Sequence, residues 1–231
     1  MTLFRYLPAV AVALFAVSAA ADPARWARDW PQTDFSLTTI DFAEVISGGP
    51  PKDGIPAIRE PAHIPVAQET RLDPREPVLT YEHEGEAPRA WPVRYLMWHE
   101  IVNDVVGGLP VAVTWCPLCN SAMVFDARVG GVRHTFGVSG LLRHSDMIMY
   151  DRETQSWWQQ AVGEGVVGHH AGVRLTPLPA WMESWGAFRD RNPDGLVMDE
   201  PDWRRAYGQN PYVGYDTSAR PFLYQGENPP H

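Results

Sequence analysis

Two cysteines separated by two residues carry the most specific chemical signal in the sequence. Cys116 and Cys119 are the only cysteines among the 231 residues, and they follow directly on the apolar run 111–115, which is expected to form a buried central strand. A disulfide across so short a loop removes little chain entropy, so a bridge that only stabilises would contribute little. The pair therefore favours thiol redox chemistry or soft-metal binding, and as a redox site it makes Cys116 and Cys119 the catalytic candidates. An inert disulfide and a reduced pair that only packs remain open alternatives.

A metal site at this pair needs more ligands than two thiolates. Structural zinc sites take four ligands and the sequence has no second C-x-x-C, whereas copper(I) accepts two thiolates and one imidazole. His99 is the expected third ligand, because its segment precedes the strand that leads to Cys116. Copper is therefore the metal that the sequence favours. In a working site, one thiol is expected to be partly exposed and to have a lowered pKa.

The residues 92–104 are predicted to form the helix that positions His99. Apolar residues recur at helical spacing, and two glycines at 107 and 108 end the run. On such a helix His99 and Asn103 share one face and are expected to face the cysteines. Four polar side chains are expected to support the site: Glu100, Asn103, Asp104 and His144. The last of them lies in a polar stretch that also fits a simple loop.

The elements around these residues predict an α+β fold, a single domain with a mainly antiparallel β-sheet and a few packed helices. Residues 22–77 are rich in proline and are expected to wrap the domain that residues 78–231 form. Gly130-Gly131 lies between two apolar runs and predicts a hairpin, and a second hairpin is expected around 151–154. A further helix is expected over 179–189.

Ten tryptophans leave a second hypothesis of function open. They suit a large aromatic core, or else an aromatic groove that binds a ligand. In the second case the protein is a non-enzymatic module that binds a ligand or a partner, and the cysteines form a structural disulfide. Whether the protein is an enzyme is left open by the sequence.

The first twenty-one residues are predicted to be a cleavable signal peptide. Arg5 precedes an uncharged apolar run, and Ala19 and Ala21 form a small-x-small cleavage pattern before Asp22. The mature chain is expected in the periplasm or outside the cell, with no stable membrane insertion. The net charge of −9 argues against nucleic acid as a partner. An unknown small molecule or a periplasmic protein is the expected partner.

Several short motifs resemble those of the bacterial family known as domain of unknown function 3179. In chain order these are DGIPA at 53–57, WHEIVND at 98–104, TWCPLCN at 114–120, FGVSG at 136–140, MYDR at 149–152, WWQQ at 157–160 and NPYVGYD at 210–216. The resemblance implies a secreted or periplasmic domain organised around a Cys-Pro-x-Cys segment. It implies no catalytic residue.

Overall fold

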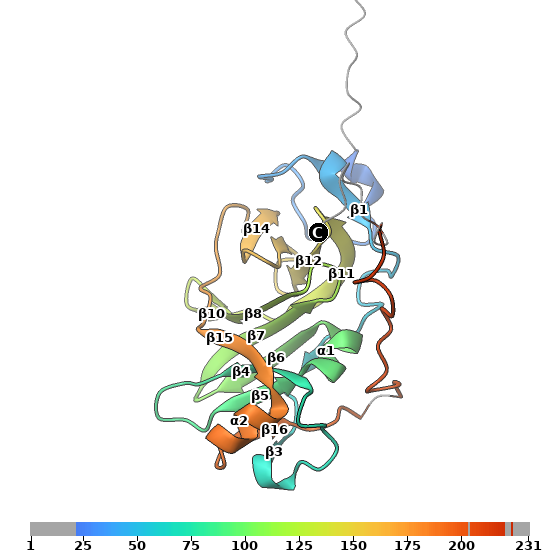
Figure 1. Cartoon of the computed structure of the whole chain (residues 1–231). Coiled ribbons are helices and arrows are strands. Elements are labelled where there is room, and N and C mark those ends of the chain that lie inside the picture. Colours follow the sequence, from blue (N-terminus) through green and yellow to red (C-terminus); the bar gives the residue numbers. More distant parts are fainter. Residues whose placement is uncertain (1–21, 203, 220–222, 224–231) are drawn as a thin grey trace, which may run out of the picture.

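Three β-sheets form the body of the protein, and they lie one above another in the view of Figure 1. We call them the upper, central and lower sheets. The computed structural model describes residues 22–202, 204–219 and 223. The predicted class is confirmed: the described residues form a single α+β domain with mostly antiparallel strands and two α-helices. Among these residues, no helix has both the length and the apolar character needed to cross a membrane.

Each of the three sheets combines strands from separate parts of the chain. The upper sheet has the antiparallel order β1 (Val45–Ser47), β11 (Phe136–Arg143), β12 (Asp146–Asp151), β13 (Trp157–Gln159) and β14 (Glu164–Val167). The central sheet has the order β2 (Ile58–Arg59), β6 (Ile101–Val106), β7 (Leu109–Cys116) and β8 (Ser121–Asp126). The lower sheet has the order β15 (Ala180–Ser184), β4 (Pro77–Tyr81), β5 (Arg89–Pro92), β16 (Leu196–Met198) and β3 (His63–Pro65).

The central sheet is buried on both faces, which explains the continuous apolar run in β7. Because successive side chains of a strand point to opposite faces, Val113 and Trp115 pack toward the lower sheet, whereas Ala112 and Cys116 pack toward the upper sheet. The expectation that residues 111–115 form a buried central strand is therefore confirmed. The same alternation aims the Cys116 side chain at the upper sheet.

The helix predicted over 92–104 is shorter than expected. Helix α1 covers Val93–His99, and β6 begins at Ile101. Glu100 lies between them with a φ of 57°, a conformation that ends the helix and turns the chain into the strand. Asn103 therefore lies on a strand, and the prediction that it shares a helix face with His99 is wrong.

The predicted hairpins are confirmed, and the second predicted helix is corrected. Gly130 and Gly131 both have positive φ and join β9 (Arg128–Val129) to β10 (Val132–Arg133), while β12 and β13 pair as the second hairpin. Residues 180–184 are instead strand β15, which pairs with β4. Only Trp185–Arg191 is helical, as α2, and Ser184 caps it by accepting a hydrogen bond from the Ala187 N–H.

Residues 22–77 pack aromatic side chains on the face of the upper sheet that points away from the central sheet. Trp26, Trp30, Phe35 and Phe42 surround Trp157 of β13 there. The segment also contains three short 3₁₀ helices, Pro23–Arg25, Phe42–Glu44 and Val66–Gln68. The predicted signal peptide, residues 1–21, lies outside the described residues.

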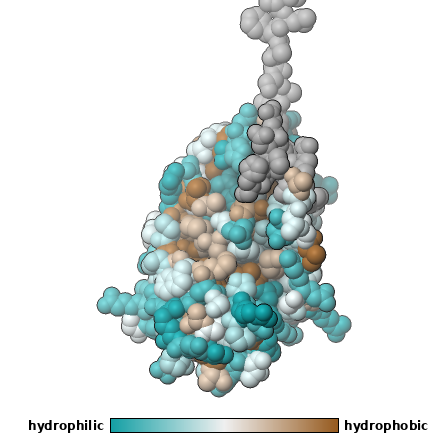
Figure 2. All heavy atoms as spheres, in the orientation of Figure 1, coloured by the Kyte–Doolittle hydropathy of each residue, from teal (hydrophilic) through white to brown (hydrophobic). Residues whose placement is uncertain are grey.

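Most tryptophans lie in the core. Seven of them are buried: Trp26, Trp30, Trp91, Trp115, Trp157, Trp158 and Trp185. Trp181 is 39% exposed, and residue 203 lies outside the described part of the chain. Figure 2 shows hydrophobic residues gathered over the middle of this face, while its lower end is mostly hydrophilic. The tryptophans therefore stabilise the layers of the fold, as the interpretation of them as core residues predicts.

Candidate functional site

The cysteine pair lies in the tight turn that joins β7 to β8. Cys116 is the last residue of β7 and is 1% exposed, and its side chain belongs to the core between the central and upper sheets. Cys119 follows in the turn and is partly exposed. Asn120 has a φ of 50° and returns the chain to β8. One sulfur is thus anchored in the core and the other lies near the surface, and both cysteines are free.

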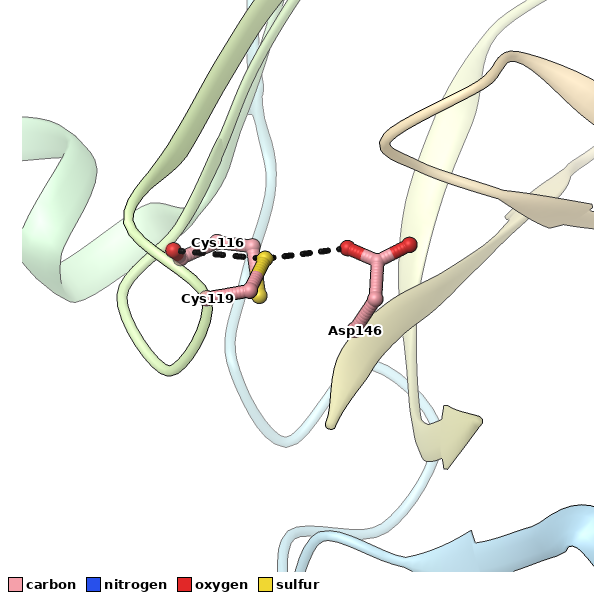
Figure 3. A group of neighbouring side chains, drawn as sticks. All are labelled: Cys116, Cys119 and Asp146. Carbon is pink, nitrogen blue, oxygen red and sulfur yellow. Dashed lines mark hydrogen bonds between the residues drawn. The ribbon is translucent and has the colours of Figure 1, made fainter. Parts of the chain in front are cut away.

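Asp146, the first residue of β12, completes a group of three donors with the two sulfurs. The Cys119 thiol donates a hydrogen bond to Asp146 Oδ1 at 3.1 Å, as Figure 3 shows. The two sulfurs and a carboxylate oxygen all lie within 4.8 Å of one another. The other carboxylate oxygen accepts hydrogen bonds from Gln159 Nε2 and, at 3.0 Å, from the Ala161 N–H. We call these three residues the thiol cluster.

A strained two-residue turn holds Asp146 in this place. His144 and Ser145 have φ values of 53° and 63°, and they join β11 to β12 through the pair Arg143 and Asp146. Such a turn matches strand twist but costs energy in residues other than glycine. The Ser145 carbonyl oxygen lies 4.0 Å from the Cys116 sulfur. From the sequence alone, Asp146 could do acid–base chemistry together with Asp151 or be an ordinary turn residue, and nothing local indicates that this turn meets the cysteines.

The environment of Cys119 is unfavourable for a free thiolate. A hydrogen bond with Cys116, burial, and the Asp146 carboxylate all raise the pKa of the Cys119 thiol well above its ordinary value. The expectation that the partly exposed thiol has a lowered pKa is therefore wrong. A cation placed among the donors would reverse this effect, since a coordinated thiol loses its proton outright.

His99, the predicted third ligand, has other partners. It is fully buried at the end of α1. Its Nδ1 lies 2.7 Å from the Pro56 carbonyl oxygen, and its Nε2 lies 2.6 Å from the Tyr207 hydroxyl. Burial lowers the pKa of the imidazole. The structure places Asp146, and not His99, in the group of donors around the two sulfurs.

Of the other predicted supporting residues, Asn103 and Asp104 make structural hydrogen bonds, and His144 lies at the surface. Asn103 joins the central sheet to the upper sheet, because its side chain bonds both the N–H and the carbonyl of Phe136. Asp104 accepts a hydrogen bond from Trp91 Nε1 at 2.9 Å. His144 is exposed and lies 3.6 Å from the Glu44 carboxylate. None of these contacts reaches a cysteine.

Glu100 differs from the other supporting residues because it lines a small cavity beside the thiol cluster. The cavity has a volume of about 80 Å³ and is otherwise mainly apolar, with Leu118, Met147 and Tyr212 among its walls. Glu100 is 7% exposed, and burial raises its pKa to about 7, although a hydrogen bond from the Tyr212 hydroxyl opposes the shift. A buried carboxyl that titrates near neutral pH is typical of functional sites.

The C-terminal segment 204–219 brings three tyrosines to this region. It runs up the side of the molecule past α1 in Figure 1. Tyr207 bonds His99, Tyr212 lies 3.5 Å from Glu100, and burial raises the pKa of Tyr215. The sequence indicated only an aromatic tail here, since a segment without helix or strand has no pattern that predicts its path.

Comparisons with known proteins place the chain in a family. No curated protein and no solved structure matches it. A family model described as "Protein of unknown function (DUF3179)" matches residues 52–230, which include the thiol cluster and the three tyrosines. The match confirms the resemblance noted in the sequence motifs. The chain belongs to the DUF3179 family of proteins of unknown function.

Proposed function

We propose that this protein binds a thiophilic metal ion at Cys116, Cys119 and Asp146. The observation that carries the proposal is the convergence of two sulfurs and one carboxylate within 4.8 Å. Three groups that are anionic when deprotonated repel one another at this distance, and a cation among them removes the repulsion. The hydrogen bonds from Gln159 and Ala161 orient the carboxylate, as neighbours of metal ligands commonly do.

The donor set favours zinc over copper(I). The sequence favoured copper because it paired the thiolates with an imidazole, whereas the structure pairs them with a carboxylate. Copper(I) is soft and prefers sulfur, while zinc accepts cysteine and aspartate in the same site. Two thiolates and one carboxylate leave one tetrahedral position for water or for another ligand, as in zinc sites that bind a substrate.

Thiol–disulfide exchange is supported less well by the same geometry. Exchange begins with attack by a thiolate, and the raised pKa of Cys119 opposes its formation. Cys116 is almost fully buried, so it is hard for a second disulfide to reach. Thiol–disulfide exchange is therefore the alternative function, and the experiment below distinguishes it from metal binding.

Cobalt(II) titration of the reduced, metal-free mature protein tests the proposal. Cobalt reports thiolate ligands through a charge-transfer band, and zinc then displaces it in competition. We expect one cobalt ion at the cysteines and the release of about two protons as both thiols ionise. Copper(I) affinity, measured with a competing chelator, is the comparison. Absence of the thiolate band, together with rapid exchange between the reduced protein and glutathione disulfide, would favour the redox hypothesis.

Three variants and one control locate the ion. Cys116→Ser and Cys119→Ser each remove a thiolate and are expected to abolish the band, while Asp146→Asn weakens binding by at least about tenfold. His144→Ala is the matched control, because His144 lies in the turn beside Asp146 but points at Glu44. If His144→Ala loses the metal as completely as Asp146→Asn does, the assignment of Asp146 as a ligand is wrong.

We also propose that the protein acts in the periplasm or outside the cell, where a small molecule or a periplasmic protein would be its partner. The support is the N-terminal sequence, with Arg5, an apolar run and the pattern at Ala19 and Ala21. N-terminal sequencing of the exported protein is expected to begin at or near Asp22. An intact Met1 on membrane-bound protein would contradict the proposal.

A further inference from the structure

A second group of potential metal ligands lies at the other end of strand β12. It consists of His134, Asp151 and His170, whose donor atoms all lie within 4.8 Å of one another. His134 and Asp151 are buried and His170 is half-buried. These residues come from the end of the β9–β10 hairpin, the last position of β12 and the loop after β14. We call them the imidazole cluster.

The two imidazoles face each other through nitrogen atoms. His134 Nε2 and His170 Nε2 lie 3.1 Å apart. Two nitrogen ligands of a tetrahedral zinc ion, each about 2.0–2.1 Å from the metal, lie about 3.3 Å apart. The spacing therefore suits both a direct hydrogen bond and a shared metal ion, with only a small movement between the two states.

The hydrogen bonds of His134 make Nε2 the ring nitrogen that can bind a metal. Its Nδ1 lies 2.9 Å from the Val132 carbonyl oxygen, which can only accept, so Nδ1 carries the proton. Nε2 then presents a lone pair toward His170. A histidine that ligates a metal commonly donates its other ring N–H to such a carbonyl. Burial lowers the pKa of His170, which favours the neutral imidazole that can bind a metal.

Asp151 is a fully buried carboxylate that uncharged groups hold in place. It accepts hydrogen bonds from the Thr154 N–H at 2.6 Å, the Thr154 hydroxyl at 2.8 Å and Trp158 Nε1 at 2.8 Å. Within the described ranges of the chain, no lysine or arginine forms an ion pair with it. A buried carboxylate is normally paired with a cation or coordinates a metal. A divalent ion between Asp151 and the imidazoles would supply that charge.

The backbone is built to bring His170 this close. A Cβ atom at Gly165 would collide with the His170 carbonyl oxygen, and one at Gly168 would lie 3.1 Å from Ser156 Cα. Ser156 Oγ accepts a hydrogen bond from the His170 N–H at 3.1 Å. The ring of Trp158 packs against the imidazole, with 5.5 Å between centroids. The loop therefore holds His170 in one position.

We propose that His134, Asp151 and His170 form a second metal site, which binds Zn²⁺ or a similar first-row divalent ion through two nitrogens and one oxygen. When the ion replaces the hydrogen bond between the imidazoles, the single ring proton of His170 moves from Nε2 to Nδ1 through solvent, so that Nε2 offers a lone pair and the imidazole stays neutral. Two imidazoles and a carboxylate are a common donor set for zinc, and they leave one position for water or another donor. The site is independent of the thiol cluster, because it shares no residue with it.

Zinc binding to the Cys116→Ser/Cys119→Ser double variant tests this site with the thiol ligands removed. We expect the double variant to bind one zinc ion per chain, measured by equilibrium dialysis and elemental analysis, with a rise in melting temperature on binding. His170→Ala in the same background is expected to abolish both effects. His169→Ala is the matched control, because His169 is the adjacent residue but is exposed and lies outside the cluster.

The outcome distinguishes the second site from the first. A double variant that binds no zinc, or one in which His169→Ala and His170→Ala lose zinc equally, overturns the imidazole site and leaves the thiol proposal untouched. If the double variant fails to fold, the two histidine variants are compared in the wild-type background. There, His170→Ala is expected to lose one zinc equivalent and to keep the thiolate–cobalt band, and an unchanged zinc content would overturn the proposal.

Discussion

Strand β12 begins and ends with an aspartate, and the two ends carry different chemistry. Asp146 meets two thiols at a turn where one of them is partly exposed, whereas Asp151 meets two imidazoles in the interior. A strand of this length separates its ends by about 17 Å, so the two clusters cannot share one ion. An aspartate therefore stands in two different donor sets, one rich in sulfur and one rich in nitrogen.

The two ends of β12 also differ in the acidic side chains that lie near them. At the thiol cluster a second buried acid, Glu100, lies beside the cavity, and its burial raises its pKa to about 7. At the imidazole cluster the only described acid among the potential ligands is Asp151. Glu100 should therefore make the stability of the protein depend on pH near neutrality, and this dependence can be tested first.

Glu100→Gln should have the largest effect, and the quantity it changes is the pH dependence of the unfolding free energy. The folded-state pKa of about 7 lies above the ordinary value of 4.5, so the folded protein favours the neutral acid. The contribution of Glu100 to the unfolding free energy is then fully present below pH 4.5 and is lost as pH rises through 7, by about 3 kcal/mol at about 1.4 kcal/mol for each pKa unit. We expect Glu100→Gln to remove most of that loss, as measured by urea unfolding of metal-free protein between pH 4.5 and 8.

Exposed Glu84 supplies the control for this measurement. Glu84→Gln should leave the pH dependence of the unfolding free energy close to that of the wild type. If Glu100→Gln shows the same loss of stability toward pH 8 as the wild type, then Glu100 is ionised in the folded protein at neutral pH, and its role as a neutral acid is wrong.

Substituting each aspartate in turn should show whether the two clusters bind metal independently. Asp146→Asn should weaken cobalt binding at the thiols by about 10- to 100-fold and leave zinc binding at the imidazoles unchanged, because each carboxylate serves only its own cluster. Asp151→Asn should do the reverse. Cobalt spectra report the first site, and zinc content of the cysteine-free double variant reports the second. Loss of both sites in either variant would show that the clusters are coupled.

Substitutions of the two neighbouring tryptophans of β13 test how much the hydrogen bond from Trp158 to Asp151 stabilises the protein. Trp158→Phe removes the indole donor of the buried carboxylate, whereas Trp157 Nε1 is buried without a hydrogen-bond partner among the described residues. Both changes remove a similar volume from the core. We expect Trp158→Phe to lower the unfolding free energy of metal-free protein by about 1–3 kcal/mol more than Trp157→Phe does. Equal losses in the two variants would mean that the indole hydrogen bond contributes nothing to stability.

Local patterns predicted much of the fold but not where its elements meet. The glycine pair at 130–131 predicted its hairpin, and the apolar run 111–115 predicted the buried strand, because both signals are short-range. The helix around 92–104 was predicted too long, since Ile101 continues the helical spacing. The left-handed conformation of Glu100, which ends the helix, has no signal in a residue other than glycine.

The sequence predicted the two cysteines of the candidate site but not the carboxylate that lies beside them. The spacing of Cys116 and Cys119 is a local feature, so the sequence alone identified the pair. Asp146 and His170 reach their clusters only through the pairing of strands and turns that are distant in the sequence. Their short polar stretches look like ordinary turns, and proximity in the sequence pointed to His99 instead.

His99→Gln should have the smallest effect, and it separates the sequence prediction from the structure most directly. Both ring nitrogens already have partners, the Pro56 carbonyl and the Tyr207 hydroxyl, and the group of donors around the sulfurs contains Asp146 in place of His99. We expect the affinity for cobalt at the thiols to stay within about twofold of wild type, which corresponds to less than about 0.5 kcal/mol. Tyr207→Phe is the matched control, because it removes the hydroxyl partner and leaves the imidazole in place. If His99→Gln weakens binding as much as Cys119→Ser does, while Tyr207→Phe does not, then His99 is the third ligand and Asp146 is only its neighbour.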